Sequence, residues 1–251
     1  HQKISTGKAE NKFGLSIKNF KSFYRSIKKY KNINLDALSV HIGSQILSDV
    51  PYKKMLNVMS NLIRELQLDL KFLDLGGGFG ISYNKKDKPI DLKKYSESVY
   101  KLAKKLKCKI IFEPGRSIIG DTGVLLSKIQ YIKKGVKKDF VIIDAGMNDF
   151  MRPALYDAVH KIIPTKKSNS KLKGVIEFVG PICESTCKFG SYKNYQKMNE
   201  NDFVAITNVG AYGSSLSSNY NSRPLIAELL VNKNKLKYIR KKQDLLKLIN
   251  S

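Results

Sequence analysis

The feature that most constrains this chain is a regular alternation of helix and strand patterns over its first 112 residues. Three segments carry apolar side chains at spacings of three and four residues, which is typical of amphipathic helices. Three short apolar runs are typical of buried strands. The predicted helices are 17–27, 55–66 and 92–106, and the predicted strands are 35–40, 70–75 and 109–112. Helices that alternate with strands cover the faces of a sheet, so we predict a parallel sheet.

Each predicted strand ends at residues that are suited to chemistry. His41 follows the first strand, a glycine triplet that begins at Gly76 follows the second, and Glu113 follows the third. The carboxyl ends of parallel strands meet at one edge of the sheet, where α/β proteins place their functional groups. A doubly wound sheet and a (β/α)8 barrel both fit this pattern. The alternation spans roughly half of the length that a closed barrel needs, so a barrel would lack its first half.

The second half of the chain has a different pattern, with strands and little helix between them. A polar run at 166–173 is predicted as a loop, and Asn232-Lys233-Asn234 is predicted as the turn of a hairpin because asparagine suits turns. The predicted strands are 123–132, 139–143, 174–179, 203–207, 225–231 and 235–239. We therefore predict an antiparallel β domain, and we place the boundary near Asp121, which divides the chain into 1–121 and 122–251.

The formal charge of +25 favours a nucleic-acid partner only if the basic residues are concentrated. Lysine is instead spread along the whole chain, which is typical of a solvated surface. No apolar run is long enough to span a membrane, and no signal-peptide pattern opens the chain, which begins at His1. Three cysteines, an odd number, argue against a disulfide framework and fit a reducing cytoplasm. With three histidines and no second cysteine pair, we expect no metal site.

The strand ends of the first half allow both a structural and a functional interpretation. The glycines at 76–78 let backbone N–H groups approach a phosphate, although they also suit a plain turn. Glu113-Pro114-Gly115-Arg116 forms a local salt bridge in the structural interpretation. In the functional one, Arg116 binds phosphate or carboxylate in bidentate fashion, and Glu113 pairs with a protonated heterocycle nitrogen. His41 and Ser44 add a flat ring and a hydroxyl, and the three strand ends together favour the functional interpretation.

Three segments of the second half also contain residues suited to chemistry. They are Arg152–Tyr156, Gly180–Ser185 and Gly210–Gly213. A fourth segment, Ser217–Pro224, would pass alone as an ordinary polar loop. Three of the six arginines of the chain, Arg116, Arg152 and Arg223, lie inside these segments or inside Glu113–Arg116. Because the chain otherwise uses lysine, these positions indicate a need for a planar, bidentate guanidinium. Cys183 also allows the plainer interpretation of a small buried apolar residue.

Taken together and in this order, the segments closely resemble the diaminopimelate decarboxylases, a branch of the pyridoxal-phosphate-dependent decarboxylases with the alanine-racemase-like fold. The resemblance runs from Ser5–Gly7 and Asn11–Gly14 to the last hairpin. Arg152–Tyr156 and Cys183–Ser185 point to the diaminopimelate branch over ornithine or arginine enzymes. The resemblance implies the C-terminal half of a (β/α)8 TIM-like barrel, which binds pyridoxal 5'-phosphate, at 1–121. An antiparallel β-barrel or sandwich domain is implied at 122–251.

The resemblance also implies roles for individual residues. His41 stacks on the ring of the cofactor, Glu113 keeps its pyridine nitrogen protonated, and Cys183 is the catalytic proton donor after carbon dioxide departs. The implied cofactor-binding residues are His41, Ser44, Gly77, Gly78, Glu113, Pro114, Gly115, Arg116 and Tyr212. The implied substrate-binding residues are Arg116, Arg152, Tyr156, Glu184 and Tyr212. Cys183 and Glu184 are expected to reach the active site of a partner subunit, so a homodimer is implied.

Two features depart from the family pattern. Cys187 stands where family members usually have aspartate, and none of the 40 lysines lies in a motif that matches the family's Schiff-base lysine. We therefore expect this stretch alone to be inactive. We expect the intact protein to decarboxylate its amino-acid substrate, meso-diaminopimelate, to lysine, the last step of lysine biosynthesis. The alternatives are decarboxylation of a related diamino acid such as carboxynorspermidine, and a non-catalytic binding module that acts through its basic surface.

Overall fold

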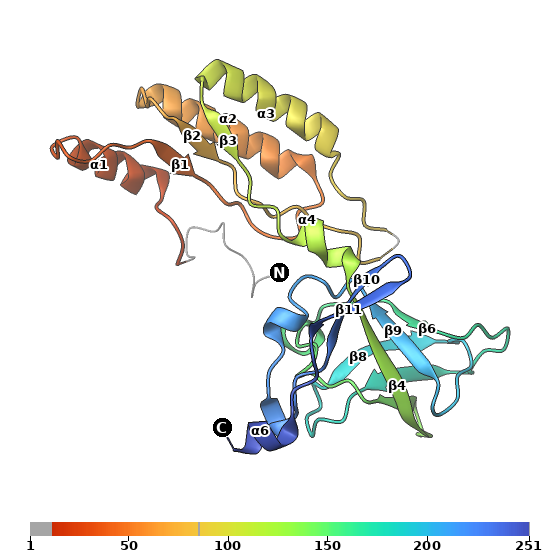
Figure 1. Cartoon of the computed structure of the whole chain (residues 1–251). Coiled ribbons are helices and arrows are strands. Elements are labelled where there is room, and N and C mark those ends of the chain that lie inside the picture. Colours follow the sequence, from red (N-terminus) through yellow and green to blue (C-terminus); the bar gives the residue numbers. More distant parts are fainter. Residues whose placement is uncertain (1–11, 85, 251) are drawn as a thin grey trace. The chain divides into compact units, whose positions relative to one another are not determined.

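The computed structural model of the chain describes residues 12–84 and 86–250. The chain forms two compact units, residues 1–118 and 119–251 (Figure 1). Of the segments that carry the family resemblance, Ser5–Gly7 and the first residue of Asn11–Gly14 lie outside the described residues. Within the described ranges, no helix has both the length and the apolar character that a membrane crossing requires.

The first unit alternates helices and strands, as the periodicity predicts (Figure 1). Its elements are α1 (Ile17–Ile27), β1 (Ala37–Ser39), α2 (Asp49–Glu65), β2 (Phe72–Asp74), α3 (Leu92–Leu106), β3 (Lys109–Ile111) and α4 (Arg116–Ile119). The strands pair in parallel in the order β1-β2-β3, so that Leu38 lies beside Leu73, and Leu73 beside Ile110. The predicted parallel sheet with helical crossovers is confirmed. Each strand is shorter than predicted, although backbone pairing continues just past the strands, where Val40 N donates to Asp74 O and Leu75 N donates to Ile111 O.

Polar side chains begin the three long helices of the first unit. Ser16 accepts a hydrogen bond from Asn19 N at the start of α1, and Ser48 caps α2 through Val50 N. Asp91 caps α3 by accepting from two backbone N–H groups of the first turn. These caps satisfy donors that a helix leaves open at its N-terminus. For α2 and α3, they also fix where the helix begins after the strand that precedes it.

The core of the first unit packs α2 and α3 with the sheet, and Tyr52, Leu73 and Tyr95 are among its buried residues. Val58, predicted on the buried face of α2, is instead 45% exposed. An α-helix turns by about 100° per residue, which puts Val58 beyond one edge of the buried stripe. Leu56, on the opposite edge, is buried in its place.

The second unit is built mainly from strands. Its elements are η2 (Gly120–Thr122), β4 (Val124–Lys133), β5 (Asp139–Ile143), α5 (Arg152–Tyr156), β6 (Ile162–Pro164), β7 (Val175–Val179), β8 (Lys188–Lys193), β9 (Phe203–Thr207), η3 (Ser214–Leu216), η4 (Tyr220–Ser222), β10 (Glu228–Asn232), β11 (Lys235–Arg240) and α6 (Leu245–Ile249). Six strands form one sheet in the order β6-β9-β4-β5-β7-β8. The pairing is antiparallel except between β5 and β7, which run parallel. The prediction of a wholly antiparallel domain is therefore wrong for this pair.

The predicted hairpin near the end of the chain is confirmed as β10 and β11. Its turn differs from the prediction in one respect, because Lys233 rather than an asparagine has the positive φ, at 54°. The predicted loop at 166–173 is also present, between β6 and β7. Two strands of the large sheet, β6 and β8, were not predicted.

Candidate functional site

The three strand ends of the first unit meet at one edge of its sheet. Gly77 N donates a hydrogen bond to Nδ1 of His41 at 3.3 Å, which joins the ends of β1 and β2. Glu113 N donates to Gly76 O at 2.9 Å, which joins the ends of β2 and β3. The side chains of His41 and Glu113 are exposed at this edge, as are Pro114 and Gly115. The structure thus brings together the residues that the sequence analysis grouped.

The glycine triplet lets these strand ends approach more closely than any other residue would allow. A Cβ at Gly77 would lie 2.1 Å from Glu113 O. A Cβ at Gly78 would lie 2.2 Å from Gly43 O, and its φ of +87° favours glycine in addition. The triplet is therefore required by the backbone packing around the edge, whatever else its N–H groups do.

Arg116 is the first residue of α4, and it is almost buried, at 7% exposure. Its guanidinium donates to the Ser44 hydroxyl at 3.2 Å and to the Tyr83 hydroxyl at 2.6 Å. The structure thus confirms that Arg116 and Ser44 lie together. Tyr83 was missed, because it lies in a polar loop with no motif around it. The resulting cluster of a guanidinium and two hydroxyl groups has the donor chemistry of an anion site.

Gln45 is a second residue whose role the motif search missed. Its side-chain amide donates to Ile81 O at 2.6 Å and accepts from Ile81 N at 3.2 Å. These two bonds tie the loop after β1, which carries Ser44, to the loop after the glycine triplet. Gln45 therefore holds in register the two loops that supply the anion cluster.

In the second unit, Arg152 begins α5 and is buried at 6% exposure. Its guanidinium lies 2.9 Å from Nε2 of His160, and Nδ1 of that ring lies 2.9 Å from Thr207 O. Tyr156 ends the same short helix and is half-buried. No role was predicted for His160.

The loop between β7 and β8 carries Cys183 and Glu184, and both are exposed. The interpretation of Cys183 as a buried apolar residue is therefore wrong. Tyr220 donates a short hydrogen bond to one carboxylate oxygen of Glu184, and the Thr186 hydroxyl donates to the other at 3.2 Å. The bond to Glu184 raises the pKa of Tyr220. Tyr220 lies in a segment that looks like an ordinary polar loop in the sequence.

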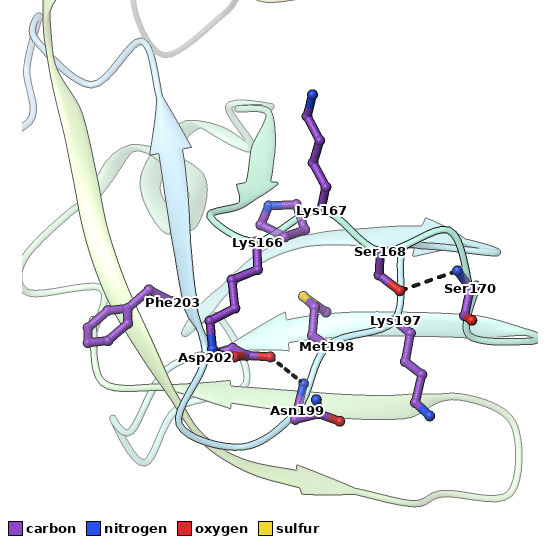
Figure 2. A pocket seen from close by; sticks show the side chains of 10 residues that line it. Lys166, Lys167, Ser168, Ser170, Lys197, Met198, Asn199, Asp202 and Phe203 are labelled. Atoms are coloured by element: carbon purple, nitrogen blue, oxygen red, sulfur yellow. Dashed lines mark hydrogen bonds and ion pairs between the residues drawn. The ribbon is translucent and has the colours of Figure 1, made fainter.

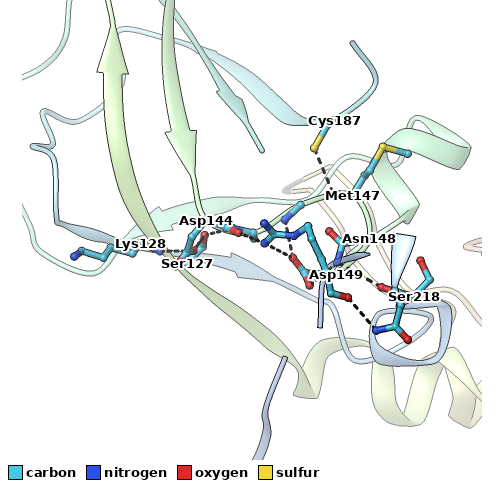
Figure 3. Close-up of polar contacts among 12 residues, drawn as sticks. Ser127, Lys128, Asp144, Met147, Asn148, Asp149, Cys187 and Ser218 are labelled. Carbon is cyan, nitrogen blue, oxygen red and sulfur yellow. Dashed lines mark hydrogen bonds and ion pairs between the residues drawn. The ribbon is translucent and has the colours of Figure 1, made fainter. Parts of the chain in front are cut away.

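Cys187, the position that departs from the family pattern, is the buried cysteine of this loop, at 2% exposure. Its sulfur accepts a hydrogen bond from Met147 N at 3.3 Å (Figure 3). A Cβ on Gly180, at the other end of the loop, would lie 2.6 Å from that sulfur. Cys187 therefore anchors the base of the loop that presents Cys183.

A polar network beside this anchor fixes the loop after β5 (Figure 3). Asp149 accepts from Gly146 N at 2.7 Å, and burial raises the pKa of its carboxyl group. Arg223 lies 3.6 Å from the same carboxylate and donates to Asp144 O at 2.7 Å. Asn148 O in turn accepts from Ser218 N at 2.9 Å. In the structure, Arg223 thus joins two segments of its own unit.

Tyr212 lies between Ala211 and Gly213, with a left-handed φ of 58° and 46% exposure. Such a φ is uncommon for a bulky residue and marks a constrained position. A hollow in the second unit lies elsewhere, between the loop after β6 and the start of β9 (Figure 2). It has a volume of about 340 Å³, it contains the ion pair of Lys166 with Asp202 at 2.8 Å, and no predicted site residue lines it.

Comparison with known proteins gives a consistent result. Residues 1–120 match the family model of the pyridoxal-binding domain of pyridoxal-dependent decarboxylases. The chain is 38% identical to diaminopimelate decarboxylase of Aquifex aeolicus over 97% of this chain and 59% of that protein. It is 40% identical to the Helicobacter pylori diaminopimelate decarboxylase over 98% of this chain and 61% of that protein. The chain thus spans about 60% of the length of these relatives.

Solved structures agree with the sequence matches. The diaminopimelate decarboxylase of Helicobacter pylori complexed with L-lysine has a TM-score of 0.89 and 39% identity, over 100% of this chain and 62% of that one. A lysine/ornithine decarboxylase from Vibrio vulnificus, at 22% identity, shares the fold with a TM-score of 0.74, over 85% of this chain and 58% of that one. The parallel sheet of the first unit accordingly resembles part of the TIM-barrel-type domain of these neighbours. The first 120 residues thus match the pyridoxal-binding domain of pyridoxal-dependent decarboxylases, and the chain as a whole is similar to diaminopimelate decarboxylases in sequence and fold.

Proposed function

We propose that the intact protein that carries this sequence catalyses the pyridoxal-phosphate-dependent decarboxylation of meso-2,6-diaminopimelate to L-lysine. The observation that carries the proposal is the sheet edge where His41, the glycine triplet and Glu113–Arg116 are joined. Similarity to diaminopimelate decarboxylases over 97% of the chain supports the choice of substrate. So does the related structure that is complexed with L-lysine, the product of this reaction.

The residues at this edge suit the cofactor. A phosphate group requires several hydrogen-bond donors, and Arg116 with the Ser44 hydroxyl 3.2 Å away supplies them. The glycine at position 78 keeps the neighbouring backbone free of a Cβ that would clash with Gly43 O. The exposed carboxylate of Glu113 is accessible to a protonated ring nitrogen. Gly77, Pro114 and Gly115 complete the proposed cofactor-binding set through their backbone.

Bound pyridoxal phosphate supplies an electron sink for the pair that is released when carbon dioxide leaves. When the cofactor is bound, Glu113 would keep its ring nitrogen protonated, which would strengthen that sink, and His41 would hold the ring. The thiol of Cys183 would donate a proton to the substrate carbon that has lost its carboxylate. The substrate carries carboxylates and ammonium groups, which require partners of opposite charge or hydrogen-bonding groups. The proposed substrate-binding residues that supply these groups are Arg116, Arg152, Tyr156, Glu184 and Tyr212.

The remaining parts of the proposal concern the assembly. We propose that 1–121 is the C-terminal half of the cofactor-binding barrel and that 122–251 forms a β-barrel or sandwich domain. The protein acts in the cytoplasm as a homodimer, in which Cys183 and Glu184 reach the active site of the partner subunit. The exposure of both side chains supports this arrangement, since a residue that serves another subunit must be accessible in its own.

Product analysis with the intact protein tests the proposal. In the presence of pyridoxal phosphate, meso-diaminopimelate should yield lysine, and carboxynorspermidine and ornithine should react much more slowly. A protein that forms no lysine from diaminopimelate would refute the proposed function. Faster turnover of carboxynorspermidine would assign the protein to that related reaction instead.

A further inference from the structure

His160 is a buried histidine that the proposed reaction leaves without a role. It lies between α5 and β6 and is only 1% exposed. Both of its ring nitrogens are engaged, Nε2 with the guanidinium of Arg152 at 2.9 Å and Nδ1 with Thr207 O at 2.9 Å. The ring of Phe150 packs edge-to-face against the imidazole, with 4.6 Å between the ring centroids and an interplanar angle of 84°. This contact fixes the plane of the His160 ring.

The two partners determine where the ring carries its proton. A guanidinium has donors and no acceptor, so Nε2 of His160 must accept from Arg152. A carbonyl oxygen only accepts, so Nδ1 must donate to Thr207 O. The neutral ring with its proton on Nδ1 satisfies both bonds, and this tautomer is assigned from the partners. A protonated ring would turn Nε2 into a donor that faces another donor.

The chain path between the two residues makes this contact possible. Helix α5 ends at Tyr156, and Asp157 follows with a left-handed φ of 54°. This turn reverses the chain, so that the side chain eight positions after Arg152 returns to it. Thr207 ends β9, so the His160 ring links the side chain of Arg152, in the short helix, to the large sheet.

We infer that His160 is a positioning residue for Arg152, and that its neutral ring holds the guanidinium in the orientation that binds a carboxylate of the substrate. The inference rests on the proposed function, in which Arg152 binds substrate. A long side chain held in one orientation before binding loses less conformational entropy when the ligand arrives. The contribution of His160 should therefore be seen in substrate affinity rather than in the chemical step.

Two substitutions in the intact protein separate positioning from packing. His160→Met fills a similar volume without a strong acceptor, and it should raise the KM for diaminopimelate about tenfold, which corresponds to about 1.4 kcal/mol, with kcat within a factor of about two. His160→Gln keeps an acceptor oxygen for Arg152, so its KM should lie much closer to that of the wild type. Equal rises in both variants, or an unchanged KM in the methionine variant, would overturn the inference.

Tyr192→Phe is the matched control. Its hydroxyl donates to the backbone carbonyl of His160 at 3.1 Å and accepts from Ile162 N at 3.0 Å, so both of these bonds are to backbone atoms. This variant loosens the same region and leaves the bond to Arg152 intact, so its KM should stay at the wild-type value. A KM rise equal to that of His160→Met would show that local loosening is the cause, and would overturn the positioning role.

The tautomer can be measured without any activity. In the wild-type protein labelled with nitrogen-15 at histidine, the resonances that vanish in His160→Gln belong to His160. They should show a protonated Nδ1 and a bare Nε2. An Nε2-protonated or doubly protonated ring would overturn the inference even in an active enzyme. A wild-type protein that forms no lysine would instead refute the proposed function, and the spectrum would still test the contact with Arg152.

Discussion

Replacing Gly77 by alanine tests whether the close approach of two strand ends builds the cofactor edge. A Cβ at this position would lie 2.1 Å from Glu113 O and 3.0 Å from Glu113 C. Nonbonded carbon–oxygen contacts are ordinarily about 3.3 Å, so the backbone of Glu113 must retreat by about 1 Å. Overpacking of this kind costs about 1–3 kcal/mol. A shift of about 1 Å in a catalytic group can lower turnover about a hundredfold.

The assays are thermal unfolding, titration with pyridoxal phosphate, and lysine formation by the intact protein. A loss of about 2 kcal/mol in the free energy of unfolding, with a Tm shift of about 2–4 °C for each kcal/mol, means that Gly77→Ala should lower Tm by about 4–8 °C. It should also weaken cofactor binding and slow turnover. Gly115→Ala is the steric control for unfolding, because its Cβ would meet nothing within 4 Å. A Gly77→Ala protein with wild-type Tm and cofactor affinity would refute the argument from close approach.

Three further variants test the loops around the candidate site. Cys187→Ala leaves Met147 N without its acceptor, at a cost of about 1–3 kcal/mol, so Tm should fall by several degrees; an unchanged Tm would contradict the anchoring role. Gln45→Ala removes both bonds to Ile81 and should weaken cofactor binding in a titration; wild-type affinity would show that these bonds are dispensable. Burial raises the pKa of the Asp149 carboxyl group in the folded protein above its value of about 3.9 in the unfolded chain. The protonated carboxyl therefore contributes to folding stability below about pH 3.9, and this contribution is lost as pH rises through the raised pKa. The Tm of Asp149→Asn relative to wild type should therefore increase as pH rises above about 4, and a difference independent of pH would contradict this.

The sheet edge of the first unit was predictable because several local signals required it. Apolar runs gave the strands, and helices between the strands forced parallel pairing, so the ends at His41, Gly76 and Glu113 had to meet. The packing adds what the pattern leaves open, namely that Gly77 is required by the backbone of Glu113. Tyr83 could not be predicted, because it reaches Arg116 only through the path of a polar loop.

The second unit was less predictable for equally physical reasons. Strand β6 has three residues and ends in Pro164, too short for a periodicity to be seen. Strand β8 contains lysines and a glycine, so its apolar alternation is weak. The parallel pairing of β5 with β7 depends on the long connection between them, whose path no local pattern fixes. The contact between Arg152 and His160 depends in the same way on the reversal at Asp157.

The most direct test of the central claim is the stoichiometry of products formed from meso-diaminopimelate by the intact protein, with and without its cofactor. The proposed function predicts lysine and carbon dioxide in equal amounts, no turnover after pyridoxal phosphate is removed, and recovery when it is added back. Turnover that continues without pyridoxal phosphate, or consumption of diaminopimelate without lysine, would contradict the claim.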